Sequence, residues 1–122
     1  MIAVGEHYMN PLPDVLVRAS DTFGGGVGGS RLELCGALAG GVLLLGALWG
    51  RVSAKEDDER VYALAKRFRE KFLEEFGETI CEPLRDTQPE AEKRCGDVVE
   101  RTVRILVTLI EEERLQVPFR GE

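Results

Sequence analysis

The chain has 122 residues, a length that suits one domain with its own hydrophobic core. Hydrophobic residues make up 43% and charged residues 31%, as in ordinary globular proteins, and the formal net charge is -6. This acidic balance argues against nucleic-acid binding, because nucleic-acid-binding proteins carry a basic surface. The three cysteines lack disulfide-framework spacing and no signal-peptide pattern is visible, so we expect a cytoplasmic protein.

The N-terminal third of the chain predicts short helices and a glycine-rich turn. Residues 1–13 have weak helical periodicity before a proline break and are predicted to be the remnant of an N-terminal helix, and residues 14–23 predict a short second helix. The glycines that follow contain a GxGxxG spacing, but no strand precedes it, so we favour a tight helix connection over a dinucleotide site. Their backbone can approach a ligand closely, which makes them candidate cofactor-binding residues. They are Gly24, Gly25, Gly26, Gly28 and Gly29.

An apolar, glycine-rich helix is predicted at the centre of the protein. Ser30 and Glu33 have the spacing of a capping box, so the helix is expected to start there and to run to Trp49. It is apolar nearly all round, which is typical of a helix buried on every side. Its uncharged stretch is about 17 residues, at the lower limit for crossing a bilayer, and its glycines also suit close packing in a bundle. We therefore expect no membrane span.

A second capping box, Ser53 and Glu56, predicts an amphipathic helix that ends at Gly77. Its apolar stripe is Val61, Leu64, Ala65, Phe68, Phe72 and Phe76. Residues 78–88 are expected to form a connection, and the last helix is expected to begin near residues 87–90 or to restart after Gly96.

The last helix has a predicted core stripe and further apolar residues outside it. The stripe is Val99, Val103, Leu106 and Ile110, and the further apolar residues are Ile105, Val107 and Leu109. This excess predicts a homodimer, in which a second copy would cover the additional apolar surface. Residues 116–122 are expected to be a tail. The fold prediction is a single all-α domain, a small bundle of about four to five helices around the glycine-rich helix.

The three thiols are the candidate reactive groups. Cys35 is predicted one turn into the central helix, where a cysteine often serves only as a small buried residue. Cys81 lies in the predicted connection, and Cys95 follows two basic residues whose charge would lower a thiol pKa. The separation of Cys81 and Cys95 fits no zinc-finger or ferredoxin pattern. His7 is the single histidine, so a Cys-His pair or a fourth metal ligand would require it.

Residues 23–29, FGGGVGG, together with CGALAG at residues 35–40, resemble the C_GCAxxG_C_C family of redox-active proteins. The later FG and the cysteines Cys81 and Cys95 are also similar to that family's pattern. The resemblance covers nearly the whole chain. It implies a small helical domain whose cysteine cluster performs redox chemistry or holds a metal or cofactor, with zinc or an iron–sulfur cluster as the candidates. The family's upstream cysteine has no counterpart here, and residues 2–8 resemble the end of the helix that carries it.

Three hypotheses follow for the function. In the first, two thiols, with Cys81 and Cys95 favoured, cycle between dithiol and disulfide with a redox partner. In the second, Cys35, Cys81 and Cys95 converge on a metal or cluster, with an open position or His7 as the fourth ligand. In the third, the cysteines are core residues of a non-catalytic helical homodimer. The distance between the cysteines distinguishes these hypotheses, because a disulfide or a shared metal needs them close together.

Overall fold

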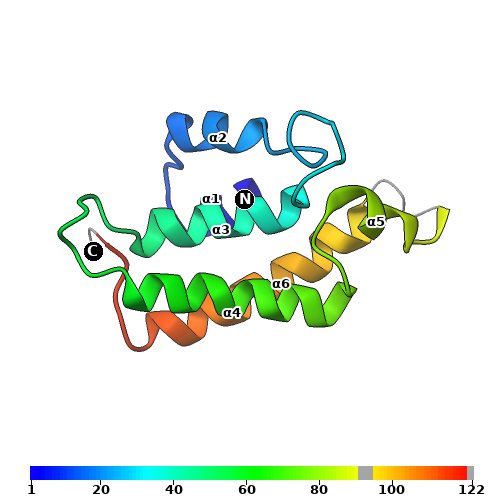
Figure 1. The fold of residues 1–122 in the computed structure, drawn as a ribbon. Coiled ribbons are helices and arrows are strands. Elements are labelled where there is room, and N and C mark those ends of the chain that lie inside the picture. Colours follow the sequence, from blue (N-terminus) through cyan, green and yellow to red (C-terminus); the bar gives the residue numbers. More distant parts are fainter. Residues whose placement is uncertain (91–94, 121–122) are drawn as a thin grey trace.

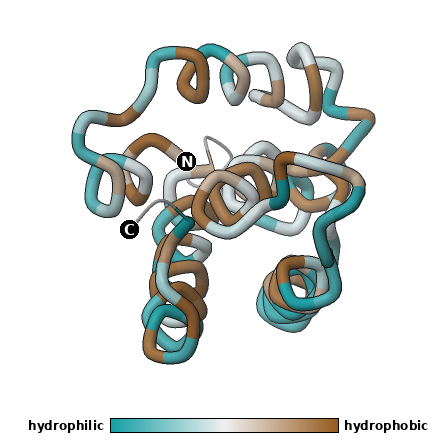
Figure 2. The backbone as a smooth tube through the Cα atoms, turned by 90° about the vertical axis from the view of Figure 1, so that its left-hand side faces the viewer, coloured by the Kyte–Doolittle hydropathy of each residue, from teal (hydrophilic) through white to brown (hydrophobic). Residues whose placement is uncertain are grey.

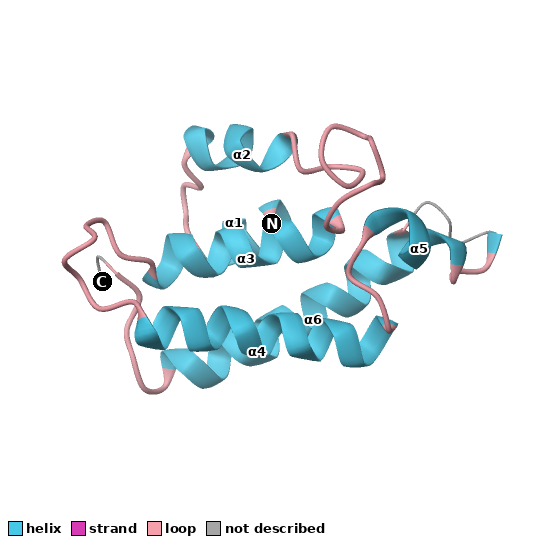
Figure 3. Cartoon of the chain, in the orientation of Figure 1, coloured by secondary structure: helices cyan, strands magenta, loops and turns pink. Residues whose placement is uncertain are grey.

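The computed structural model describes residues 1–90 and 95–120, and its helices are joined by loops and turns (Figure 3). The helices are α1 (Ile2–Tyr8), α2 (Asp14–Asp21), α3 (Gly36–Trp49), α4 (Glu59–Phe76), α5 (Cys81–Asp86) and α6 (Gly96–Arg114). The described residues form no β-strand, only one isolated bridge between Leu34 and Ile80. The prediction of an all-α bundle is confirmed.

Helices α3, α4 and α6 pack against one another and enclose the core (Figure 1). The predicted central role of the glycine-rich helix is confirmed, because α3 packs on both other long helices and is buried along much of its length. Its buried leucines are Leu38, Leu44, Leu45 and Leu48. Helix α4 contributes Leu64, Phe68, Phe72 and Phe76, all of which belong to its predicted stripe. It ends at Gly77, as predicted, where the backbone turns into the left-handed region at φ 74°.

Two glycines of α3 allow close packing. A Cβ on Gly41 would overlap the ring of Phe68, so the glycine lets α4 approach the α3 backbone. A Cβ on Gly40 would lie 3.2 Å from the Cβ of Met1, so the N-terminal residue also sits directly on α3. Helix α2 contacts α3 as well and lies above the three long helices when the bundle is viewed along its axis (Figure 2).

Both predicted capping boxes form turns, so two helix starts were predicted too early. Helix α3 begins at Gly36 instead of Ser30, because the Ser30 hydroxyl donates to the Gly26 carbonyl and accepts from the Leu32 amide. Serine side chains readily compete in this way with helix formation. Helix α4 begins at Glu59. The Glu56 carboxylate is engaged by the backbone amide of Val52 and by Arg120, which keeps the preceding residues in a separate turn.

Helix α6 begins at Gly96, the later of its two predicted starts. Its buried residues are Val98, Thr102, Leu106, Leu109 and Ile110. The predicted stripe was wrong at Val99, which is 49% exposed, because Val98 faces the core instead. The stripe also includes the polar residue Thr102, whose hydroxyl donates to the Val98 carbonyl at 2.7 Å and so avoids an unsatisfied group. Leu109 is buried within the protomer, and the homodimer stays a prediction.

The segment after α6 packs on the bundle, although it was predicted as a tail. The Phe119 ring is 7% exposed and lies edge-on to the rings of Tyr8 and Trp49, with centroid distances of 5.5 and 5.0 Å. The Trp49 indole donates to the Val117 carbonyl, and the Arg120 amide donates to the Leu48 carbonyl. We call this region, Tyr8, Trp49 and residues 117–119, the aromatic end. No helix in the described part of the chain is both long enough and apolar enough to span a membrane.

Candidate functional site

The three cysteines line one pocket at the opposite end of the bundle from the aromatic end. The pocket has a volume of about 500 Å³ and is lined by residues of the glycine-rich loop, α5 and the start of α6. These segments lie at one end of the bundle (Figure 1). Cys35 is the N-cap of α3, Cys81 is the first residue of α5, and Cys95 is the N-cap of α6. Residues 22–35, 77–85 and 95–99 are called the cysteine end below. The structure therefore brings together thiols that lie 60 residues apart in sequence, from position 35 to position 95.

Backbone hydrogen bonds hold Cys35 and Cys81 side by side. The Cys35 amide donates to the Thr79 carbonyl, and the Cys81 amide donates to the Glu33 carbonyl, both at 2.8 Å. The bridge between Leu34 and Ile80 lies between these bonds. The segment after α4 can run alongside residues 33–35 because α4 ends at Gly77. The Glu78 carboxylate also accepts the amides of the two residues that follow it, which fixes the start of this segment. The pairing of two loop segments thus fixes two of the three thiols.

The glycine-rich loop packs directly on Cys81. Gly26 has φ 70°, and a Cβ at this position would come within 2.5 Å of the Cys81 Cβ. Only glycine fits here, because a side chain is disfavoured both by the left-handed backbone and by the lack of space. Gly25 and Gly29 line the pocket, whereas Gly28 has open space around it. Of the predicted cofactor-binding glycines, Gly25 and Gly29 border the pocket and Gly26 shapes it by packing.

The predicted position of Cys35, one turn inside the helix, was wrong: it is the N-cap residue directly before the first residue of α3. The side chain is 7% exposed, and burial raises the pKa of its thiol above the ordinary value. The backbone amides of Ala37 and Leu38 act in the opposite direction, although their geometry falls short of a side-chain cap hydrogen bond. Negative charge on Cys95 or on Cys81 would raise the Cys35 pKa further. Burial therefore favours the protonated form of the Cys35 thiol, because it raises the pKa of this group.

Cys81 is also buried, with 6% of its surface exposed, and it is the first residue of α5 where a connection was predicted. Burial raises the pKa of the Cys81 thiol, and negative charge on Cys95 is the second contribution in the same direction. The positive charges of Arg85 and Arg31 act against this increase. Cys81 and Cys95 line the same pocket, close enough for charge on Cys95 to affect the Cys81 thiol.

Cys95 is the most exposed of the three cysteines. Its backbone is in the left-handed region at φ 65°, uncommon for a residue with a side chain, and its carbonyl accepts the Val99 amide in the first turn of α6. The two basic residues predicted to lower its pKa, Lys93 and Arg94, lie outside the described residues. Unusual backbone conformations of this kind are common where a functional group must be held in place.

The predicted fourth ligand or catalytic partner does not join the thiols. His7 is an exposed residue of α1, where its ring lies against Tyr8. Tyr8 in turn donates to Glu111 near the end of α6, so His7 belongs to the other end of the bundle. Within the described residues, no three His, Cys, Asp or Glu side chains are grouped closely enough to hold a metal ion. Cys35, Cys81 and Cys95 share a pocket but are not arranged as a set of metal ligands, and each is a thiol in this structure.

Sequence reasoning missed several pocket residues. Arg31 lines the pocket, yet it was hidden within an expected helix start. Val99 was predicted to be a core residue and instead forms part of the pocket wall together with Val98. Arg85 lies four residues after Cys81 in sequence, and it also lines the pocket. No local signal marks Arg31, because the two middle positions of a capping box accept any residue.

Comparison with known protein families finds a match that includes the cysteines and glycines of the site. The family described as "Putative redox-active protein (C_GCAxxG_C_C)" matches residues 1–109, which include the glycine-rich loop, all three cysteines and most of α6. No curated protein and no solved structure matches the chain. Because the match extends over most of the sequence, the chain belongs to the C_GCAxxG_C_C family.

Proposed function

We propose that the protein is a thiol–disulfide redox protein in which Cys95 is the attacking thiol and Cys81 the resolving thiol. The observation that supports it most is the convergence of three cysteines, distant in sequence, on one pocket. Cysteines that served only to fill the core would have no reason to border a common cavity. The family description as redox-active agrees with this use of the thiols.

The exposure of the thiols supports the assignment of roles. An attacking thiol must reach the sulfur of an incoming disulfide, and Cys95 is the most exposed of the three. Cys81 is buried beside it, with a raised pKa, so it is poorly suited to a first attack on a partner in solution. A buried thiol next to the mixed disulfide can still complete the exchange. Cys35 lies on the same pocket as a third thiol, held at the start of α3.

The reaction is an exchange of two electrons with a disulfide substrate. The Cys95 thiolate attacks one sulfur of the substrate disulfide, which forms a mixed disulfide and releases the first substrate thiol. The Cys81 thiolate then attacks the Cys95 sulfur, which closes a Cys81–Cys95 disulfide and releases the second substrate thiol. The protein loses two thiol protons and two electrons, and the substrate disulfide gains both. A reducing dithiol restores the starting state by the reverse steps.

The alternative function is a metal or iron–sulfur binding module, since soft thiolates are the ligands that zinc and iron–sulfur clusters prefer. It would require the three thiols to move closer together than they stand in the described residues. One experiment separates the two functions. The protein is purified without oxygen, its zinc and iron are measured, and its thiols are counted in the native and the unfolded protein before and after reaction with a disulfide.

For the redox function we expect no stoichiometric metal and a fall from three thiols to one after oxidation. The Cys35→Ala variant should still lose two thiols, whereas Cys81→Ala and Cys95→Ala should form no intramolecular disulfide. Cys35→Ala is the matched control, because it removes a thiol of the same pocket. Stoichiometric zinc or iron, with thiols that react only after the metal is removed, would support the binding module. Three thiols that persist after oxidation would refute the redox proposal.

A further inference from the structure

The pocket has a charge opposite to that of the whole chain. Its lining contains two arginines, Arg31 and Arg85, and its described residues include no carboxylate. The chain as a whole has 22 acidic against 16 basic residues. Two positive charges concentrated beside three thiols therefore make this a local positive site on an acidic protein. A concave site of one sign of charge raises the local concentration of ligands of the opposite sign.

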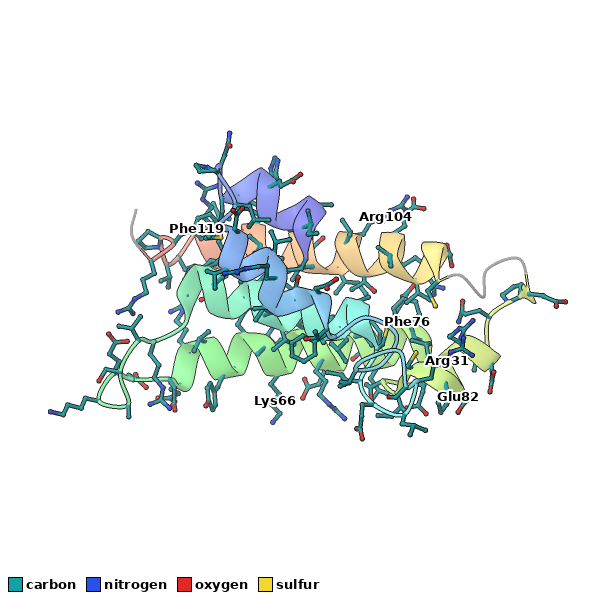
Figure 4. All side chains as sticks on the ribbon, turned by 90° about the horizontal axis from the view of Figure 1, so that it is seen from above. Arg31, Lys66, Phe76, Glu82, Arg104 and Phe119 are labelled. Atoms are coloured by element: carbon teal, nitrogen blue, oxygen red, sulfur yellow. The ribbon has the colours of Figure 1, made fainter. Side chains whose placement is uncertain are left out.

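Arg31 is held at the pocket by its backbone. It has φ 65°, and its amide donates to the Gly25 carbonyl at 2.8 Å while its carbonyl accepts the Glu82 amide at 2.9 Å. Its guanidinium forms no hydrogen bond or ion pair with another described residue. Figure 4 shows Arg31 at the cysteine end, with Glu82 nearby. The Glu82 carboxylate does not line the pocket, and its charge has the smallest of the effects on Cys81, after those of Arg85 and Arg31.

The remaining walls suit a small organic molecule. The valines Val98 and Val99 give the pocket an apolar side, and Gly25 and Gly29 bring bare backbone to its edge. Its volume of about 500 Å³ is within the usual range for small-molecule sites, roughly 300–1,000 Å³. A ligand that uses all these features has a negatively charged group for the arginines and a sulfur for the thiols.

We propose that the pocket selects disulfides of small thiols that carry carboxylates, with Arg31 and Arg85 binding the carboxylate while the disulfide faces Cys95. This inference rests on the proposed function, because it names the substrate class for the same thiols. The exchange follows the steps given above: one small carboxylate thiol leaves when Cys95 forms the mixed disulfide, and the second leaves when Cys81 resolves it. Arginine is well suited to the role, since its planar guanidinium binds a carboxylate through two parallel hydrogen bonds.

Three disulfides of similar size and different charge test the selection. The reduced protein is mixed with dithiodiglycolate, which is anionic, 2-hydroxyethyl disulfide, which is neutral, or cystamine, which is cationic. Each oxidation rate is divided by the rate of the same disulfide with a small reference thiol, which removes intrinsic differences in reactivity. We expect the anionic disulfide to react about tenfold faster than the neutral one on this scale, with a preference that shrinks at high salt. The acidic net charge of the chain works against this result, so the test is strict.

The variants are Arg31→Gln and Arg85→Gln, each of which should reduce the ratio of the anionic to the neutral normalised rate several-fold. The matched control is Arg104→Gln. Arg104 is exposed on α6, pairs with Glu100 and lies away from Arg31 in Figure 4. Equal normalised rates for the three disulfides, or a preference unaffected by the Arg31 and Arg85 substitutions, would overturn the substrate class and leave the redox function standing.

Two further outcomes distinguish a failure of the proposed substrate class from a failure of the proposed redox function. If none of the small disulfides oxidises the protein but the reduced protein cleaves the disulfides of insulin, the substrate is a protein and the inference is wrong. If neither reaction occurs, the proposed redox function fails as well.

Discussion

The two ends of the bundle are stabilised in opposite ways. The aromatic end is filled by side chains: Phe119 contacts Tyr8 and Trp49, and the Arg114 guanidinium lies 4.4 Å from the centre of the Phe119 ring. The cysteine end is held by main chain, through glycines in left-handed conformations and hydrogen bonds between two loop segments. Part of the pocket wall there carries little or no side chain, because Gly25, Gly29, Gly36 and Ala37 are among its lining residues. The comparison teaches that the end with the three thiols surrounds a cavity of about 500 Å³, whereas at the aromatic end rings pack edge-on against one another.

The difference predicts which kind of change each end tolerates. Removing atoms should damage the aromatic end, because a cavity remains where rings were packed. Adding atoms should damage the cysteine end, because the loop there already touches Cys81.

The largest effect is expected for Phe119→Ala. Truncating this buried ring removes its contacts with Tyr8 and Trp49 and should lower the free energy of unfolding by about 3 kcal/mol. Urea denaturation monitored by circular dichroism measures this change. The reaction rate of the thiols with a neutral disulfide should stay the same, since the pocket lies at the other end.

Phe119→Leu is the control for Phe119→Ala, because it retains much of the buried volume and should cost about half as much. A thiol rate that changed in Phe119→Ala and not in Phe119→Leu would show that the two ends are coupled, contrary to the comparison.

An intermediate effect is expected for Gly26→Ala. The added methyl group would collide with the Cys81 Cβ in a backbone conformation that disfavours side chains, so the loop should lift away from the pocket. The free energy of unfolding should fall by about 2–3 kcal/mol, and Cys81 should become reactive toward a thiol reagent in the native protein.

Gly28→Ala separates these two causes. Gly28 has a similar φ of 61° but open space around it, so only the backbone cost of about 1–2 kcal/mol applies and Cys81 should stay protected. If both alanine variants exposed Cys81 equally, close packing of the loop on this thiol would not be what protects it.

The smallest effect is a loss of stability at alkaline pH that begins at the cysteine end. The pKa values of Cys35 and Cys81 are raised, so above the ordinary thiol pKa of about 8.5 the folded state keeps protons that the unfolded state has released. The unfolding free energy of the reduced protein should therefore be fully retained below that pH and fall as the pH rises. At the aromatic end, burial raises the pKa of Tyr8 to about 12, with help from Glu111, so its contribution should be lost only from about pH 10 upward.

Urea midpoints measured from neutral to alkaline pH check this order. In the double variant Cys35→Ala/Cys81→Ala, the decrease in unfolding free energy that begins near the thiol pKa should be absent. In Tyr8→Phe, the later decrease at higher pH should be absent. An unchanged early decline in the double variant would mean that other groups cause it.

The fold was largely predictable because the periodic spacing of apolar residues in the sequence indicates which residues are buried. The stripe of α4 and the apolar character of α3 follow from spacing alone, and both were confirmed. The helix starts were less predictable. Ser30 and Ser53 carry capping signals, but hydroxyl and carboxylate groups also stabilise isolated turns, and only tertiary contacts such as that between Arg120 and Glu56 decide which occurs.

The site was predictable in its residue types and not in its arrangement. Cys35, Cys81 and Cys95 could be chosen from the sequence, but their common pocket depends on the pairing of residues 33–35 with residues 79–81, which no local pattern encodes. The burial of Cys81 could not be predicted for the same reason, because Gly26, distant in sequence, packs against it. The role of Arg31 depends on a left-handed backbone that is rare for arginine.

Backbone amides in the paired loop segments allow the local stability of the site to be measured. The amides of Cys35, Cys81 and Glu82 donate across the pairing to the carbonyls of Thr79, Glu33 and Arg31. In native-state hydrogen–deuterium exchange these amides can exchange only when the two segments part, which requires less than global unfolding. Their exchange rates therefore measure the opening free energy of the cysteine end by itself. Compared between the dithiol and oxidised states, they would show whether closing a disulfide tightens or loosens the segments that hold it.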